Sequence, residues 1–330
     1  MNWVNRLPVD PLPTLLSADH EALRYFARRD LLGEKAGPVN TLWELSEAQK
    51  LLKKQQENGS WRYPGKNRSV YQETNYDLLE TYRSLGVLVE KYGFDREHPA
   101  MAHAAEYVFS CQTEEGDIRG VLGTQYMPYY HAVITELLIK AGYGDDARIE
   151  KGVDWLLTMR QDDGGWIVPM QGVPAKEKTR EMWSAPPVPR DRSKPFSHLA
   201  TGMVLRAFAV HPRYSELSEA RHAGKLLKSR FFRSDKYGDR KGPRYWTKFQ
   251  FPFWWSNVLT ALDSLSLMGF STDDDDIRRG LEWFVSNQDE NGLWRTSYEQ
   301  AKRREMTVKE KDAMLWVGLA VCRVFERFFG

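Results

Sequence analysis

Cysteine is scarce in this chain, and so are the usual signs of a membrane or secreted protein. The two cysteines, Cys111 and Cys322, form neither a metal-spaced pair nor a disulfide framework. No segment offers 18 uninterrupted apolar residues, and the N-terminus lacks the apolar stretch of a signal peptide. The net charge is only +2, which gives no bias toward nucleic acid. We therefore expect a cytoplasmic protein with no metal, no transmembrane segment and no nucleic-acid partner.

Several signatures of common catalytic sites are also missing. At a credible place the sequence shows no Gly-rich phosphate loop, no Gly-x-Ser-x-Gly elbow and no His-Glu-x-x-His pair. It also shows no Asp-Asp-x-x-Asp magnesium box there. These absences predict a protein without a bound cofactor, and they leave its reaction and oligomeric state open.

What the chain does contain is a repeated loop that ends a helical run. Each copy has a Gln, then a Gly that can adopt the left-handed cap conformation, then in three copies a Trp that can cover the helix end. The positions that we assign to this structural repeat are Gln56, Gly59 and Trp61; Gln112 and Gly116; Gln161, Gly165 and Trp166; and Gln288, Gly292 and Trp294. Internal repeats of this length predict an array of helical hairpins.

Small residues recur upstream of these loops. Ala48, Ala104 and Gly280 lie eight positions before the Gln of their copies, and Gly152 lies nine before Gln161. Such residues allow one helix to approach its neighbour closely. The 127-residue gap before the last Gln predicts a degenerate repeat near 224–232.

The hydrophobic pattern predicts eleven helices, the first at 20–34 after an extended arm at 1–18. Outer helices, charged on one face, are expected at 41–56, 98–112, 148–161, 217–231 and 274–288. More apolar inner helices are expected at 71–92, 127–142, 197–210, 251–269 and 307–328. The chain then reads as an N-terminal arm and first helix (1–40) followed by a repeat domain (41–330), a single structural domain overall.

The repeated loops resemble the Gln-x(2–5)-Gly-x-Trp repeats of the terpene cyclase and protein prenyltransferase superfamily, from about Thr41 to the end of the chain. The resemblance implies an all-α fold, an α/α toroid of helical hairpins that forms a complete or incomplete barrel of six. It also implies that the repeat residues tie the hairpins together and take no part in catalysis.

Two features that could carry the family's chemistry do not fit it. The run from Asp273 to Asp276 matches the acidic Asp-x-Asp-Asp motif of class II cyclases, but it precedes an outer helix. Carboxylates there are expected to cap amides at the helix start. Neither cysteine follows the Asp of a prenyltransferase zinc site, which argues against zinc-dependent alkylation.

The candidate site residues lie where the inner helices begin, because parallel inner helices would bring their N-termini to one end of the cavity and favour an anion. As catalytic candidates we take Glu73, His131, His198 and Asp312. As ligand-binding candidates we take Tyr129, Tyr130, Phe253, Trp254, Trp255, Asn257, Arg244 and Lys248. Helix caps and core packing are the alternative roles for all of these residues.

Two stretches shape the functional prediction. Phe249, Phe251, Phe253, Trp254 and Trp255 form the densest aromatic cluster, and 228–250 is strongly basic. Aromatic faces suit an apolar chain, a sugar ring or a carbocation, and a basic rim suits an anionic group. The leading hypothesis is a cavity for an isoprenoid or other amphipathic ligand with an anionic head.

The sequence is also compatible with two other classes of function. A carbohydrate-active barrel, a lyase or a hydrolase, would use paired carboxylates, here Glu73 and Asp312. A non-catalytic binding or assembly toroid is the third possibility.

Overall fold

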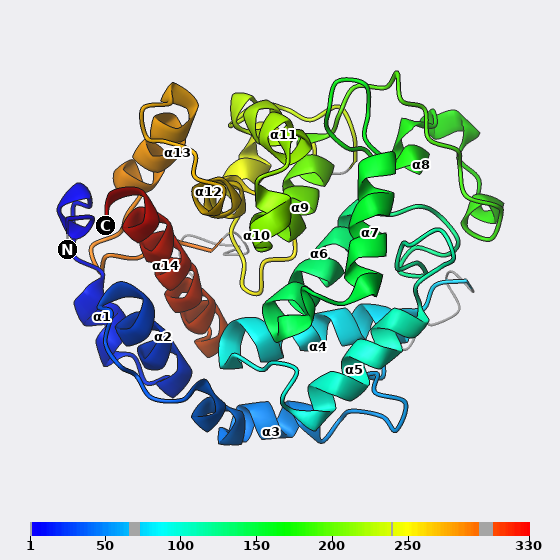
Figure 1. The fold of residues 1–330 in the computed structure, drawn as a ribbon. Helices are drawn as coiled ribbons and strands as arrows, with labels where there is room; N and C mark the ends of the chain where they lie inside the picture. The colour runs from blue at the N-terminus through cyan, green and yellow to red at the C-terminus, as the bar shows by residue number, and fades with distance from the viewer. Residues whose placement is uncertain (1, 66–72, 239, 297–305) are drawn as a thin grey trace. The chain divides into compact units, whose positions relative to one another are not determined.

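The computed structural model describes residues 2–65, 73–238, 240–296 and 306–330. Over these ranges the regular structure is helical, and β-pairing is limited to isolated bridges (Figure 1). The predicted all-α class is therefore confirmed. The chain divides into two compact units: unit 1 comprises Met1–Pro38, Gly224–Asp235 and Arg240–Gly330, and unit 2 comprises Val39–Ala223 and Lys236–Asp239.

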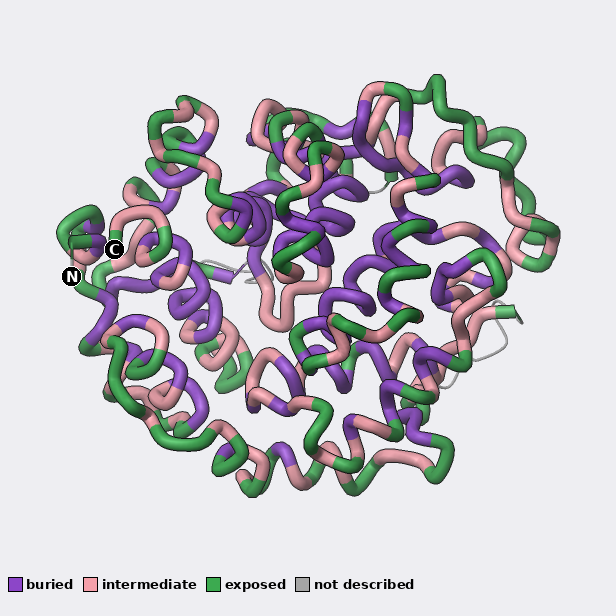
Figure 2. The backbone as a smooth tube through the Cα atoms, viewed as in Figure 1, coloured by how far each residue is buried: buried purple, intermediate pink, exposed green. Residues whose placement is uncertain are grey.

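Unit 2 alternates between buried and amphipathic helices, as the hairpin pattern predicts. Its helices are α3 (Ser46–Leu52), α4 (Tyr76–Tyr92), α5 (Pro99–Ser110), α6 (Pro128–Leu138), α7 (Ala147–Thr158), α8 (Pro169–Gly172), α9 (His198–Ala209) and α10 (Pro212–Ser215). Helix α6 packs along α9 and against α4 and α7. Every residue of α9 is buried, whereas α7 buries one stripe (Figure 2). Inner helices α4, α6 and α9 thus form the core of this unit.

Unit 1 is built around its last helix. It contains α1 (Leu12–Ser17), α2 (Glu21–Leu31), α12 (Val258–Leu267), α13 (Asp275–Ser286) and α14 (Val308–Phe329), while α11 (Ser218–Ser229) belongs partly to each unit. Helix α14 contacts α1, α2 and α12. No helix in the described ranges is long and apolar enough to cross a membrane.

Two helix boundaries in unit 1 differ from the prediction. The expected extended arm contains helix α1, whose second residue is Pro13, a position where the missing N–H costs nothing. Helix α12 begins at Val258, seven residues later than predicted, because Asn257 and Thr260 close a capping box there. The aromatic residues before Asn257 are consequently outside the helix.

The start of α13 confirms the capping role of the acidic run. Asp274 is the N-cap, and its carboxylate accepts from the backbone N–H groups of Asp276 (3.0 Å) and Ile277 (3.4 Å). The Lys228 ammonium lies 2.7 Å from Asp274 and 3.3 Å from Asp276. The carboxylates at the start of this helix are therefore paired within unit 1.

Four loops of common geometry, 55–61, 112–118, 160–166 and 288–294, end the outer helices, and we call them clasp loops. In each, the first side chain donates to the carbonyl of the glycine four residues later, with donor–acceptor distances of 2.7 to 3.1 Å. The first residues are Gln55, Gln112, Arg160 and Gln288. In three loops the same amide also donates to a backbone carbonyl of another segment, at Ala100 of α5, Arg148 of α7 and Val9 before α1. Each Gln amide thus joins its loop to another part of the chain.

This geometry corrects the predicted register in two copies. The clasping side chain is Gln55 and not Gln56 in the first copy, and Arg160 and not Gln161 in the third. The glycine with positive φ in the third copy is Gly164 (98°), not Gly165. In the corrected register the spacing is uniform, because all four loops place Gly at the fifth position and Trp or Ile at the seventh. The sequence alone does not show this register, because the first copy has two adjacent glutamines and the third has two adjacent glycines.

The tryptophans close the clasp loops as predicted. Trp61, Trp166 and Trp294 are at most 2% exposed, and each indole N–H donates to the carbonyl ten residues earlier, at 2.7 to 2.9 Å. A Cβ on Gly59 would lie 2.1 Å from the His103 carbonyl oxygen of α5, so only glycine fits there. Close approach of the loop to the next outer helix therefore requires the glycine.

Candidate functional site

The predicted aromatic cluster separates into a core residue and a surface segment. Phe249 is fully buried in unit 1 and packs on Trp283 and Phe284, with ring centroids 5.4 and 5.5 Å apart. The four aromatic residues of 251–255, which we call the aromatic segment, are only half-buried. Of the predicted cluster, Phe249 therefore belongs to the core, and the aromatic segment alone is accessible to a ligand.

The aromatic segment rests on helix α14. The ring of Phe251 stacks on Trp316 with centroids 4.9 Å apart and an interplanar angle of 11°. Phe253 meets Phe251 edge to face at 5.4 Å. Trp316 is itself 1% exposed, so it forms a rigid base under the segment.

Basic side chains lie over two aromatic rings, one in the aromatic segment and one in the stretch of chain before it. The Arg240 guanidinium is 3.8 Å from the Trp255 ring centroid. The cations of Arg244 and Lys248 lie 5.4 and 4.8 Å from the ring centroid of Tyr245. Tyr245 belongs to the 3-10 helix η6 (Pro243–Thr247), which thus brings the two predicted cationic residues onto one ring.

Asp312 lies next to His20, a residue outside the predicted set. The Nε2 atom of His20 is 3.8 Å from Asp312 Oδ1, and its Nδ1 accepts from the Leu23 N–H at 3.3 Å. Because Nδ1 accepts, a neutral His20 carries its proton on Nε2, toward the carboxylate. Trp316 is one turn beyond Asp312 on α14 and meets the His20 ring edge to face at 5.4 Å. Asp312, His20, Trp316 and the aromatic segment are consequently linked within unit 1.

Asn257 has a structural role in this unit. Its Oδ1 accepts from the Thr260 N–H at 3.0 Å, and its Nδ2 donates to the Lys248 carbonyl at 3.2 Å. The residue is 2% exposed. Asn257 therefore fixes the start of α12 and holds the backbone of Lys248.

In unit 2, His131 occupies a position where two other clasp loops have a threonine, the one that accepts from the backbone N–H of the last loop residue. Trp61 N and Trp166 N donate to the hydroxyls of Thr81 and Thr201, each on an inner helix, at 3.0 and 2.9 Å. At the corresponding position of the second clasp loop, Ile118 N donates to His131 Nδ1 at 3.0 Å.

The other ring nitrogen of His131, Nε2, is 3.0 Å from the Gly152 carbonyl oxygen. Backbone groups therefore occupy both nitrogens, and the role that the geometry gives to His131 is structural instead of the predicted catalytic one. Burial lowers the pKa of His131 to about 4, so the ring is neutral at pH 7.

The predicted tyrosines of α6 lie beside a buried ion-pair network that the sequence did not reveal. Tyr129 and Tyr130 have ring centroids 4.8 Å apart, and Tyr130 meets Tyr82 of α4 edge to face at 6.0 Å. Tyr129 and Tyr82 are buried, and burial raises the pKa of Tyr82 well above its usual range.

The network joins the three inner helices of unit 2. Glu136 of α6 lies 2.8 Å from Arg206 of α9, and Lys140 lies 2.8 Å from Glu136 and 2.6 Å from Glu90 of α4. Burial raises the pKa of Glu136, but Arg206 and Lys140 outweigh that effect and keep it below its ordinary value. These charges connect α4, α6 and α9.

The two remaining candidates lie at helix starts in unit 2. Glu73 is exposed and precedes α4 by three residues. His198 is the first residue of α9, 6% exposed, behind the N-cap Ser197. Both stay predictions, as does the pairing of Glu73 with Asp312, because these carboxylates belong to different units. No group of three or more potential metal ligands occurs in the part of the chain that the structure describes.

Residues 75–182 match the family described as "Squalene-hopene cyclase C-terminal domain". A comparison with curated proteins gave no match.

Solved structures give weak similarities. They include a protein from Actinoplanes (16% identity, 99% of this chain and 89% of that one, TM-score 0.44). They also include the type II terpene cyclase MstE from Scytonema (12% identity, 87% and 96%, TM-score 0.33). A MstE variant in complex with geranylgeranyl dihydroxybenzoate, its substrate, matches at 12% identity over 88% and 96%, with a TM-score of 0.34.

Proposed function

We propose that this chain binds an isoprenoid or similar amphipathic molecule with an anionic head, and that the aromatic segment of unit 1 contacts its apolar part. The observation that carries the proposal is that Phe251, Phe253, Trp254 and Trp255 are only half-buried. Covering such surface with a hydrocarbon chain is favourable by about 25 cal/mol per Å². The match of residues 75–182 to a squalene-hopene cyclase domain supports an isoprenoid as the ligand and a toroid as the fold.

The head of the ligand is assigned to Arg244 and Lys248. Both cations lie within 5.4 Å of the Tyr245 ring centroid, which places two positive charges around one side chain. Arg244 is exposed and Lys248 is half-buried, which leaves them accessible from solvent. An anion there would be bound by two charges, with the bidentate geometry that a guanidinium favours.

If the ligand is converted, Asp312 is the acid. Its carboxyl proton would pass to one carbon of a C=C bond, the π electrons would form the new C–H bond, and the adjacent carbon would become a cation. His20 would then stabilise the Asp312 carboxylate at 3.8 Å. The stacked aromatic faces beside it would stabilise the carbocation through their quadrupoles. A cytoplasmic location fits this proposal.

Binding can be tested by quenching of tryptophan fluorescence with three probes: geranylgeranyl diphosphate, geranylgeraniol and inorganic diphosphate. We expect the full molecule to bind more tightly than either half. Trp254→Ala should weaken the binding of geranylgeranyl diphosphate and of geranylgeraniol. Arg244→Gln should weaken the binding of geranylgeranyl diphosphate and leave that of geranylgeraniol unchanged. Arg28→Gln, an exposed arginine of the same unit outside the basic stretch 228–250, is the matched control. Equal affinities for all three probes, or no binding, would overturn the proposal.

Catalysis needs a separate test. Purified protein is incubated with prenyl diphosphates and their aromatic esters, and organic extracts are examined by mass spectrometry. Asp312→Asn should abolish any product while keeping the affinity for the probes within about twofold. Unchanged product formation in that variant would exclude Asp312 as the acid, and binding without product in the wild type would make this a binding protein.

A further inference from the structure

The clasp loops of unit 2 do not all contact the next outer helix in the same way. In the first two, the Gln amide donates to the carbonyl of the second residue of that helix, Ala100 of α5 and Arg148 of α7, at 2.8 Å in both. A Cβ on the glycine of either loop would lie 2.1 or 2.7 Å from the carbonyl oxygen of the fifth residue, His103 or Lys151. We call these loop-to-helix contacts joints, and the first two joints are made to helix backbone.

The third joint, between the loop at 160–166 and α11, is made to side chains. Arg160 takes the place of the Gln, and its Nε donates to the Gly164 carbonyl at 3.1 Å. In the described ranges its guanidinium donates to no carbonyl of α11. The ring of His222, the fifth residue of this helix, lies against the loop, where a Cβ on Gly164 would meet its Cδ2 at 2.5 Å. The loop therefore contacts an exposed imidazole where the other two contact backbone.

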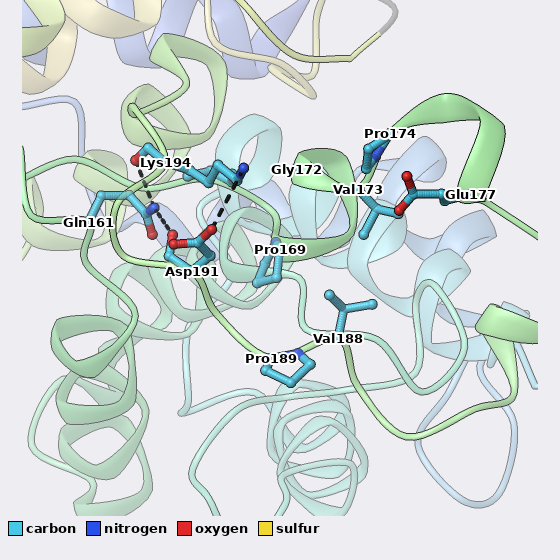
Figure 3. A pocket seen from close by; sticks show the side chains of 11 residues that line it. Gln161, Pro169, Gly172, Val173, Pro174, Glu177, Val188, Pro189, Asp191 and Lys194 are labelled. Carbon is cyan, nitrogen blue, oxygen red and sulfur yellow. Dashed lines mark hydrogen bonds and ion pairs between the residues drawn. The ribbon is translucent and has the colours of Figure 1, made fainter.

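The Gln next to Arg160 does not supply the missing bond. The Gln161 amide donates to the carbonyls of Asp191 (2.6 Å) and Lys194 (2.9 Å) in the connection before α9, as Figure 3 shows. The third joint consequently lacks the hydrogen bond that the first two share.

The apolar anchor of α11 is also the smallest of the three. The third residue of α5 is Met101 and that of α7 is Ile149, and both are 1% exposed. The third residue of α11 is Ala220, which is fully buried. Stabilisation by burial grows with the apolar area that leaves water, so the start of α11 is held by less of it.

Opposite charges meet at the third joint. Glu219 is the second residue of α11, the position that supplies the carbonyl acceptor in the other two joints. Burial lowers the pKa of the Arg160 guanidinium below its ordinary value, and attraction to the Glu219 carboxylate opposes that effect. Charge attraction near a protein surface is weakened by added salt.

We propose that the third joint is where unit 2 opens: the first six residues of α11 (218–223) separate from the third clasp loop while the first two joints stay closed. All six residues belong to unit 2. The free energies of local opening within one protein extend from near zero for weakly held segments to that of global unfolding, so the weakest joint opens first. Because a pair of charges takes part in this joint, its opening depends on ionic strength.

Hydrogen exchange of the full chain, measured by mass spectrometry in about 0.05 M and about 1 M NaCl, tests the inference. The amides to compare occupy the fourth to sixth positions of each helix: 221–223 in α11, 102–104 in α5 and 150–152 in α7. Protection at 221–223 should be at least about tenfold lower than in the other two helices, and about two- to fivefold lower again at the higher salt concentration. Equal protection in the three helices, or no effect of salt at 221–223, would overturn the proposal.

Two variants assign the effect to the joint. Arg160→Gln removes the pair of charges, so protection at 221–223 should no longer change with salt. Adding His222→Ala removes the intervening ring and lets the new amide reach the Glu219 carbonyl, which should raise protection at least about threefold above the wild type.

Arg83→Gln, an exposed arginine of α4, is the matched control and should keep the salt dependence of the wild type. Thermal melts establish that each variant is folded. Salt dependence that persists in Arg160→Gln, or a double variant no better protected than the wild type, would refute the third joint as the point of opening.

Discussion

Acid should destabilise unit 2 through His131. The folded protein holds this ring neutral with a pKa of about 4, against an ordinary value of 6.5. The unfolded chain binds the proton more readily than the folded protein does. The contribution of the neutral ring to the free energy of unfolding is therefore complete above pH 6.5 and is lost as the pH falls toward 4. The lowered pKa corresponds to about 3 kcal/mol in total, and to about 2 kcal/mol at pH 5.

The assay is urea unfolding at pH 7, 6, 5 and 4.5, for the wild type and for His131→Asn. Asparagine keeps an acceptor for the Ile118 N–H and cannot be protonated in this range. The substitution lowers stability at pH 7 because it removes the His131 ring, which packs on Trp155 with ring centroids 5.3 Å apart. Between pH 7 and pH 5, however, the wild type should lose about 2 kcal/mol more than the variant. Parallel pH profiles of stability for the wild type and His131→Asn would refute the assignment of His131 as a buried, neutral acceptor for the Ile118 N–H.

Three further predictions concern substitutions that disturb the packing of unit 2. Trp166→Ala should lower the free energy of unfolding by about 3–5 kcal/mol, since the ring is fully buried and bonds the Leu156 carbonyl; an unchanged melting temperature would contradict this. Gly59→Ala should cost several kcal/mol more than Gly269→Ala in chemical denaturation, because both have positive φ but only Gly59 lacks room for a Cβ. Arg206→Met should cost about 3–5 kcal/mol by removing one of the two cations that pair with the buried Glu136 and leaving Lys140 alone, and adding Glu136→Met should recover most of that loss; no recovery would show that the pair is not coupled.

Much of the architecture followed from periodicity and loop composition. Inner and outer helices alternate in unit 2 as predicted, and the Trp that ends three of the four clasp loops is buried. The acidic run at 273–276 caps a helix, as its position indicated. These features depend on residues close in sequence, so local patterns were sufficient.

The errors arose where two residues of one kind are adjacent or where a partner is distant. Gln55 and Gln56 both satisfy the repeat, and only the hydrogen bond to Gly59 distinguishes them. His20 was not identified because its partner Asp312 is 292 positions away in sequence. The signal that could have found the role of His131 is its alignment with Thr81 and Thr201, which requires the correct register of the clasp loops.

The most direct test of the proposed ligand site is photo-crosslinking with a geranylgeranyl diphosphate analogue that carries a diazirine on the chain. Labelled peptides are mapped by mass spectrometry. The label should fall within the aromatic segment 251–255, and excess unlabelled geranylgeranyl diphosphate should prevent it. Labelling spread over the exposed faces of α5 and α7, or labelling that the competitor does not reduce, would contradict the assignment of the aromatic segment as the ligand-binding surface.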